Sequence, residues 1–181
     1  MLTTQKRYFL FANIGLISGL TCGTGQYFLP DNQIVIDYYP AVLLGIFLYL
    51  AGYYLIYPGI KKQLVRLIIL IIFSSLGWRL SINYGFTWGG PAPFVNAGAL
   101  GAFMVSLGWV IAWKIRSDIL RFILIITAAG AFGGLIFQMT DAMLSTSEDL
   151  WIIILFTEWQ LVLFIGIALS YLFSKNPAVF S

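Results

Sequence analysis

The chain contains no histidine, one cysteine and few charged residues. Without histidine it has no ligand for a histidine-bound haem or metal ion and no imidazole for acid–base catalysis. The single thiol, Cys22, allows neither an intrachain disulfide nor a multi-thiolate metal site. Seven acidic side chains leave few other catalytic groups. We therefore expect no enzyme, no catalytic residues, no metal site and no cofactor.

The scarcity of charged residues also indicates whether the protein lies in water or in a membrane. Charged residues make up 9% of the 181 residues and hydrophobic residues 60%, whereas a soluble domain is about 25% charged and about 45–50% apolar. Ten basic and seven acidic side chains cannot cover the surface of a soluble fold of this size. With a mean hydropathy of +0.92, the composition predicts an integral membrane protein whose main partner is the lipid bilayer.

Six apolar segments are long enough to cross a bilayer, which requires about 20 residues of helix. Short connections with proline and glycine separate them. Pro40 falls in the first turn of the second segment, where its missing N–H costs nothing. The sequence therefore predicts one transmembrane domain over residues 1–181, an all-α bundle of six transmembrane helices. The predicted spans are residues 8–28, 38–57, 64–83, 94–113, 119–139 and 150–173.

The basic residues lie on one side of this six-span arrangement. Nine of the ten flank alternate ends of the spans, and they are Lys6, Arg7, Lys61, Lys62, Arg66, Lys114, Arg116, Arg121 and Lys175. The loops of the other side carry acidic residues and no lysine or arginine. The positive-inside rule predicts that both termini are cytoplasmic, in a plasma (inner) membrane. Because the net charge of +3 follows this topology, we expect no nucleic-acid partner.

Two charged residues, Arg79 and Glu158, lie within predicted spans. An ionisable residue inside a membrane is by default a functional-site hypothesis. At 1.5 Å per residue, Arg79 lies about 6 Å and Glu158 about 12 Å below the outer edge. The two side chains lean toward the same depth, so they can pair if the third and sixth helices are neighbours. Alternatively, Arg79 reaches the interface without a partner, or a pair merely locks two helices together.

Four other residues complete the predicted ligand-binding set. Trp78 and Trp159 each adjoin one of the two charges and are candidates for the walls of a pocket. Gln138 and Asn83 belong to polar stripes on the fifth and third helices and are candidate hydrogen-bonding groups. The alternative for the tryptophans is an aromatic belt at the membrane interface.

Small residues form stripes on two helices. Gly15, Gly19 and Gly23 make two overlapping G-x-x-x-G steps on the first helix, and Gly130 and Gly134 make another on the fifth. Such stripes let helix backbones approach closely in lipid. They indicate tight packing inside the bundle. The alternative is docking of another membrane subunit, or of a second copy of the chain, through the first helix.

The two halves of the chain share short patterns. Residues 11–15 and 94–98 both read F-x-N-x-G, and residues 78–80 and 159–161 both read W-polar-L. With three spans per half, this weak similarity predicts a 3+3 inverted repeat, an arrangement typical of transporters.

Together these patterns favour a multi-pass protein that binds or passes a small solute through a pocket open to the extracytoplasmic side. Arg79 would bind an anionic or polar group, and Glu158 a cation or proton, or it would orient Arg79. The alternative function is a non-catalytic structural or assembly subunit of a larger membrane complex, favoured by the glycine face of the first helix.

Overall fold

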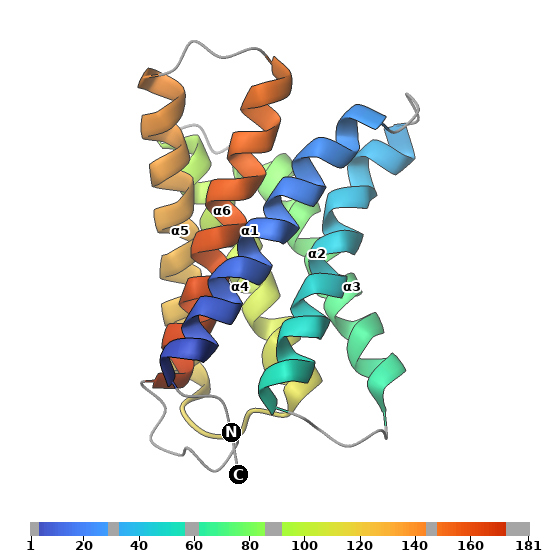
Figure 1. Cartoon of the computed structure of the whole chain (residues 1–181), viewed down its shortest axis with the longest axis vertical. Helices are drawn as coiled ribbons and strands as arrows, with labels where there is room; N and C mark the ends of the chain where they lie inside the picture. Colours follow the sequence, from blue (N-terminus) through green and yellow to red (C-terminus); the bar gives the residue numbers. More distant parts are fainter. Residues whose placement is uncertain (1–3, 29–32, 57–61, 86–91, 144–147, 173–181) are drawn as a thin grey trace.

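The computed structural model describes residues 4–28, 33–56, 62–85, 92–143 and 148–172. These residues fold into six α-helices and one short π-helical turn, with no strand among them (Figure 1). In chain order they are α1 (Thr4–Phe28), α2 (Gln33–Ile56), α3 (Gln63–Leu80), η1 (Ser81–Gly85), α4 (Pro93–Trp113), α5 (Ile119–Met143) and α6 (Glu148–Leu172). The predicted all-helical class is confirmed.

Five of these helices are long and apolar enough to cross a membrane. They are α1, α3 with η1, α4, α5 and α6. The apolar stretch of α2, Tyr38–Tyr54, is shorter, although the helix itself has 24 residues. The chain is therefore an integral membrane protein with several spans.

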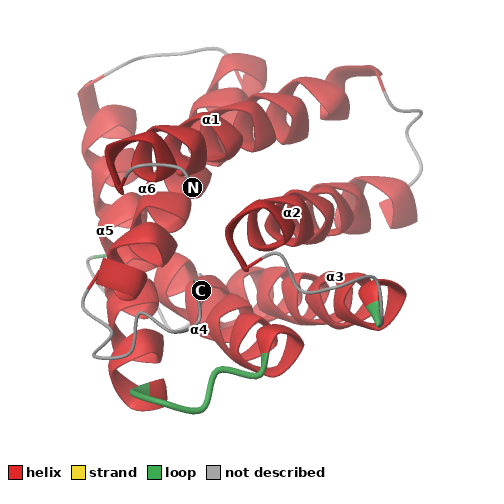
Figure 2. Cartoon of the chain, turned by 60° about the horizontal axis from the view of Figure 1, so that its bottom comes forward, coloured by secondary structure: helices red, strands yellow, loops and turns green. Residues whose placement is uncertain are grey.

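The helices form a ring in chain order, which Figure 2 shows from the end where α1 begins. Each helix packs against the next one in the chain, and α6 packs against α1 to close the ring. Because connections are short, consecutive helices run in opposite directions (Figure 1). The starts of α1, α3 and α5 therefore lie at the same end as the ends of α2, α4 and α6.

Two helix boundaries differ from the sequence prediction. Helix α2 begins at Gln33, so Pro40 lies in the helix interior and not in its first turn. An interior proline removes one N–H from the helix ladder, and the Pro40 carbonyl also lies 3.5 Å from the Cys22 Sγ atom, which donates to it. The third span does not end at Asn83, because η1 continues it to Gly85 as a π-helical turn. Such turns are rare and are frequent at functional sites.

The glycine face of α1 lies against α6. A methyl group on Gly15 would lie 2.9 Å from Phe164 Cβ, and one on Gly19 would lie 2.5 Å from Thr157 Cα. One on Gly23 would lie 2.6 Å from the Cα atom of Ile153. These separations leave no room for a side chain, so the absence of Cβ atoms sets the distance between the two helices.

The glycines of α5 lie against α4. Gly130 packs against the backbone of Gly98, and Gly134 packs against the backbone of Phe94 and Val95. Helix α4 is thus held between α3 and α5. This close approach brings Gly98 and Gly101 of α4 into contact with the Trp159 side chain of α6, next to the cavity described below.

The hydrophobic core fills the end of the ring where α1 begins. Its largest buried side chains include Trp109, Phe11, Phe164 and Ile126, all fully buried. The Trp109 Nε1 atom donates a hydrogen bond of 2.7 Å to the Tyr171 hydroxyl, so this aromatic core also satisfies its polar groups. Empty space is left toward the opposite end of the bundle.

Candidate solute cavity

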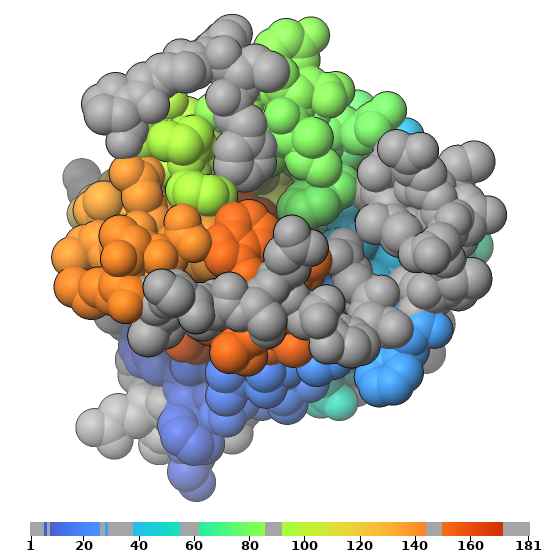
Figure 3. Space-filling model, turned by 90° about the horizontal axis from the view of Figure 1, so that it is seen from above, coloured from blue at the N-terminus to red at the C-terminus, as the bar shows by residue number. Residues whose placement is uncertain are grey.

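A cavity lies between α2, α3, α4, α5 and α6 in the half of the bundle opposite to the start of α1. Its empty volume is about 690 Å³ with its opening to the surroundings included. Viewed from that end, the surface is hollowed between α6 and the end of α3 with η1 (Figure 3). The lining residues are Pro40, Ala41, Leu44, Ser74, Trp78, Ser81, Ile82, Phe94, Ala97, Gly98, Gly101, Val105, Gly134, Leu155, Phe156, Trp159 and Gln160. None of these is charged.

Trp78 and Trp159 form part of the wall, from α3 and α6. The Trp78 ring lies 5.2 Å from the ring of Phe156, centroid to centroid, and tilts by 32° against it. Trp159 packs against α4 at Gly101. A methyl group at that position would lie 3.0 Å from the Trp159 Cζ2 atom, so the missing side chain leaves room for the ring. The indole nitrogens of both tryptophans are buried and have no hydrogen-bond partner.

Gln160 is the most buried polar residue of the wall, with 1% of its surface exposed. Its Oε1 atom accepts a hydrogen bond from the Ser18 hydroxyl of α1. The Cys22 Sγ atom, one turn further along α1, lies 3.8 Å from the same oxygen. Both contacts come from α1, so the close packing of that helix against α6 brings one hydroxyl donor and one thiol near the amide oxygen.

Two serines of the wall donate their hydroxyls to backbone carbonyls. Ser74 donates to Leu70 O and Ser81 donates to Ala97 O, each over 2.7 Å. The second bond joins η1 to α4. The π-helical turn therefore positions Ser81 against α4 at the outer part of the cavity.

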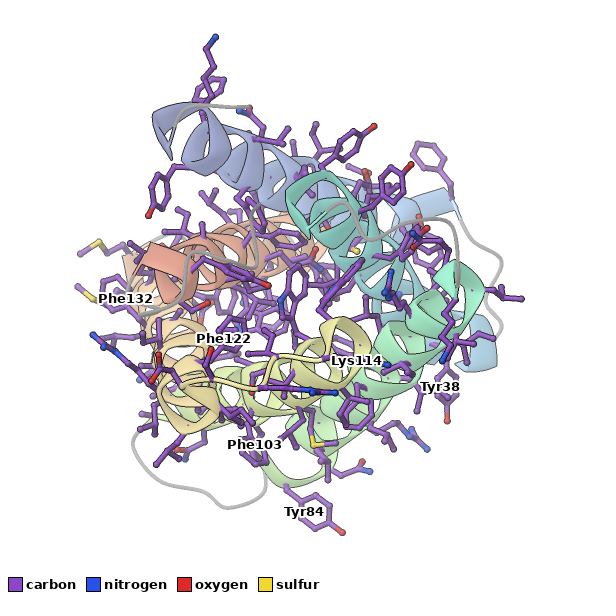
Figure 4. All side chains as sticks on the ribbon, turned by 90° about the horizontal axis from the view of Figure 1, so that it is seen from below. Tyr38, Tyr84, Phe103, Lys114, Phe122 and Phe132 are labelled. Atoms are coloured by element: carbon purple, nitrogen blue, oxygen red, sulfur yellow. The ribbon has the colours of Figure 1, made fainter. Side chains whose placement is uncertain are left out.

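Arg79 and Asn83 do not line the cavity. Both side chains are exposed, and the Arg79 guanidinium lies 5.6 Å from the centre of the Tyr38 ring. Tyr38 points away from the bundle, as Figure 4 shows. Arg79 therefore lies at the periphery, between α3 and α2.

Glu158 and Gln138 also lie outside the cavity wall. Glu158 is half-buried, and its Oε1 atom accepts a hydrogen bond of 2.8 Å from the Thr140 hydroxyl of α5. Its Oε2 atom is buried without a hydrogen-bond partner. Gln138 is half-buried on α5. Glu158 faces α5 and Arg79 faces α2, so the hypothesised pair between the two charges is not formed.

The structure thus brings Trp78 and Trp159 together and separates them from the other four predicted residues. Sequence reasoning assigned no binding role to Gln160 or Ser81, which do line the cavity. Gln160 had a usable signal, because an amide in the middle of an apolar span needs a partner there. Ser81 had none, since serines are common in membrane helices and its contact depends on the π-helical turn.

The cavity has the composition of a ligand-binding site, with apolar walls and a few polar groups. Among the described residues, no group of three or more Cys, Asp or Glu side chains comes together that would hold a metal ion. Comparison with protein-family models, with curated proteins and with solved structures finds no match to this chain.

Proposed function

We propose that this protein spans the membrane six times, has both termini in the cytoplasm and binds a small solute in the cavity, which opens to the extracytoplasmic side. The observation that carries the proposal is the cavity itself, an apolar pocket with one fully buried amide. Apolar walls with a few polar groups are the usual composition of a small-molecule site.

The charge distribution supports this orientation. Exposed basic side chains gather at the end where α1 begins, and they are Lys6, Lys62, Lys114, Arg116 and Arg121. Positive charge near span ends favours the cytoplasmic side. The cavity lies toward the other end, so it faces the exterior under this orientation.

The alternative function, a structural or assembly subunit, has less support. Its main argument was the glycine face of α1, and α6 of the same chain covers that face. A partner subunit or a second copy that docks on α1 would contact its outward residues instead, such as Leu16, Ile17 and Leu20. We therefore prefer solute binding.

Two measurements test the proposal. The first addresses orientation, with single cysteines at positions 145 and 62 in a Cys22→Ala background. A membrane-impermeant thiol reagent added outside cells should label position 145 and not position 62. The opposite pattern would invert the topology and place the cavity on the cytoplasmic side.

The second measurement addresses the cavity. The unfolding temperature of the purified protein is followed over a concentration series of two small neutral probes, acetophenone and α-methylstyrene. A ligand that binds the folded state should raise this temperature in a saturable way. Ala97→Leu, which fills the cavity, should abolish the rise, and Ala128→Leu, on the exposed face of α5, should keep it. A missing rise in the wild type, or an equal rise in Ala97→Leu, contradicts the proposal.

A further inference from the structure

The polar groups that line the cavity indicate which class of ligand it can bind. Gln160 offers one amide oxygen and one amide nitrogen, and the two faces of the group meet different surroundings. The oxygen accepts from Ser18 and lies near Cys22, both on α1. In the structure the Ser18 hydroxyl, which can donate or accept, donates to this oxygen. This arrangement fixes the amide with its oxygen toward α1 and its nitrogen on the other side.

The amide nitrogen of Gln160 donates no hydrogen bond to any described residue, although the side chain is almost fully buried and lines the cavity. An amide donor on the wall of a cavity that has no acceptor in the protein can bond to a molecule inside the cavity. The amide nitrogen of Gln160 is therefore a candidate contact for a bound molecule.

The wall contains two further donors that lack an acceptor. Trp78 and Trp159 add two buried indole N–H groups without partners, and an indole nitrogen can only donate. The hydroxyl protons of Ser74 and Ser81 are already used on backbone carbonyls, so these two serines offer a ligand only acceptor lone pairs. The donors left for a ligand in the described wall are the Gln160 amide nitrogen and the two indole N–H groups.

The wall also excludes charged ligands. None of the described lining residues is acidic or basic, and an ion in such an apolar space would lose its hydration without compensation. Arg79 and Glu158 cannot supply that compensation, because they face α2 and α5.

We infer that the cavity selects a neutral, largely apolar molecule with an acceptor oxygen, such as a ketone, ester or amide carbonyl, which the Gln160 amide nitrogen binds. This inference rests on the proposed solute-binding function. It adds the ligand class and assigns Ser18 a positioning role, because its hydroxyl holds the amide in the donating orientation. The carbonyl comes either from an extracellular solute or from the ester linkage of a membrane lipid.

The test compares two probes of nearly the same shape. Acetophenone carries a carbonyl oxygen where α-methylstyrene carries a methylene group, so only the first accepts a hydrogen bond. The wild type should bind acetophenone roughly five- to tenfold more tightly, as expected for one net hydrogen bond. Benzoate, the charged analogue, should not bind measurably.

Two variants assign the preference to its residues. Gln160→Leu should bind both neutral probes equally, while Gln63→Leu, the same change at the start of α3, should keep the preference. Ser18→Ala retains the donor but frees its orientation, so the preference should fall. This second variant keeps the inference testable if Gln160→Leu does not fold.

The outcomes separate this inference from the proposed function. If neither neutral probe binds, solute binding and the inference both fail. If both probes bind equally well to the wild type, or if the acetophenone preference survives both variants, the cavity binds solutes but the inference is overturned. Mass spectrometry of lipids that copurify with the wild type and are lost in Gln160→Leu would identify a lipid ester as the source. Selective acetophenone binding without such a lipid would identify a solute.

Discussion

Replacing Gly19 by alanine should weaken the contact between α1 and α6. The new methyl group would lie 2.5 Å from Thr157 Cα and 2.6 Å from the Phe156 carbonyl oxygen. Carbon atoms reach their optimal separation at about 3.5–4.0 Å, so the helices must separate by about 1 Å. Both obstructing atoms belong to the backbone and cannot rotate away. The same shift would loosen the contacts of Gly15 and Gly23 with α6.

The size of the effect follows from two opposing terms. Overpacking costs about 1–3 kcal/mol, and the upper value applies because the backbone must move. Alanine gains up to about 1 kcal/mol over glycine in helix propensity. The net loss should be about 2 kcal/mol, or roughly 30-fold in the ratio of folded to unfolded protein.

Equilibrium unfolding in mixed detergent micelles, followed by circular dichroism, measures this loss. Gly133→Ala serves as the control, because the atom nearest to its new methyl group, Trp159 Cα, would lie 3.2 Å away. This variant should stay within about 1 kcal/mol of the wild type. If Gly19→Ala proves as stable as Gly133→Ala, the glycine contact does not set the helix separation.

Three further predictions concern the other polar contacts. Arg79 and Glu158 contact different helices, so Arg79→Met and Glu158→Gln should have additive effects on the free energy of unfolding. A double-mutant cycle measures this, and a coupling above about 0.5 kcal/mol would contradict the observed separation. Thr140→Val removes the bonded donor of Glu158 and should destabilise the protein by about 1–3 kcal/mol in the same unfolding assay; an unchanged stability would mean that water or lipid headgroups satisfy the carboxyl group. Tyr171→Phe leaves the buried Trp109 N–H without an acceptor and should cost a similar amount, with Trp109→Phe added to it recovering part of the loss; no recovery would show that packing and not the hydrogen bond dominates.

The helical architecture could be predicted from sequence because a bilayer restricts which backbone structures can span it. A span needs about 20 apolar residues, and the chain offers such segments separated by proline and glycine. The start of α4 at Pro93 and that of α5 at Ile119 lie within one residue of the prediction. The start of α2 at Gln33 was predicted five residues late, at Tyr38, since hydropathy identifies the apolar stretch and not the polar first turns of the helix.

The candidate site was harder to predict because the rotation of each helix about its axis is not encoded in hydropathy. Neighbouring residues differ by about 100° around a helix. Trp78 faces the cavity, so Arg79 turns away from it, and the same holds for Trp159 and Glu158. Arg79 and Glu158 lie close to the cavity along their helices, but it is the neutral residues next to them, Trp78 and Trp159, that line it. The predicted inverted repeat stays a prediction.

The contact between α1 and α6 has a consequence for biogenesis. Ser18 and Gln160 are separated by 142 positions in the chain, and every other helix is synthesised between them. Helix α1 is synthesised before α6, so its glycine face has no cover until α6 arrives. During that interval the face is open to lipids and to insertion factors. The amide that lines the cavity is likewise oriented only by this last step, so completion of the ring and maturation of the binding site coincide.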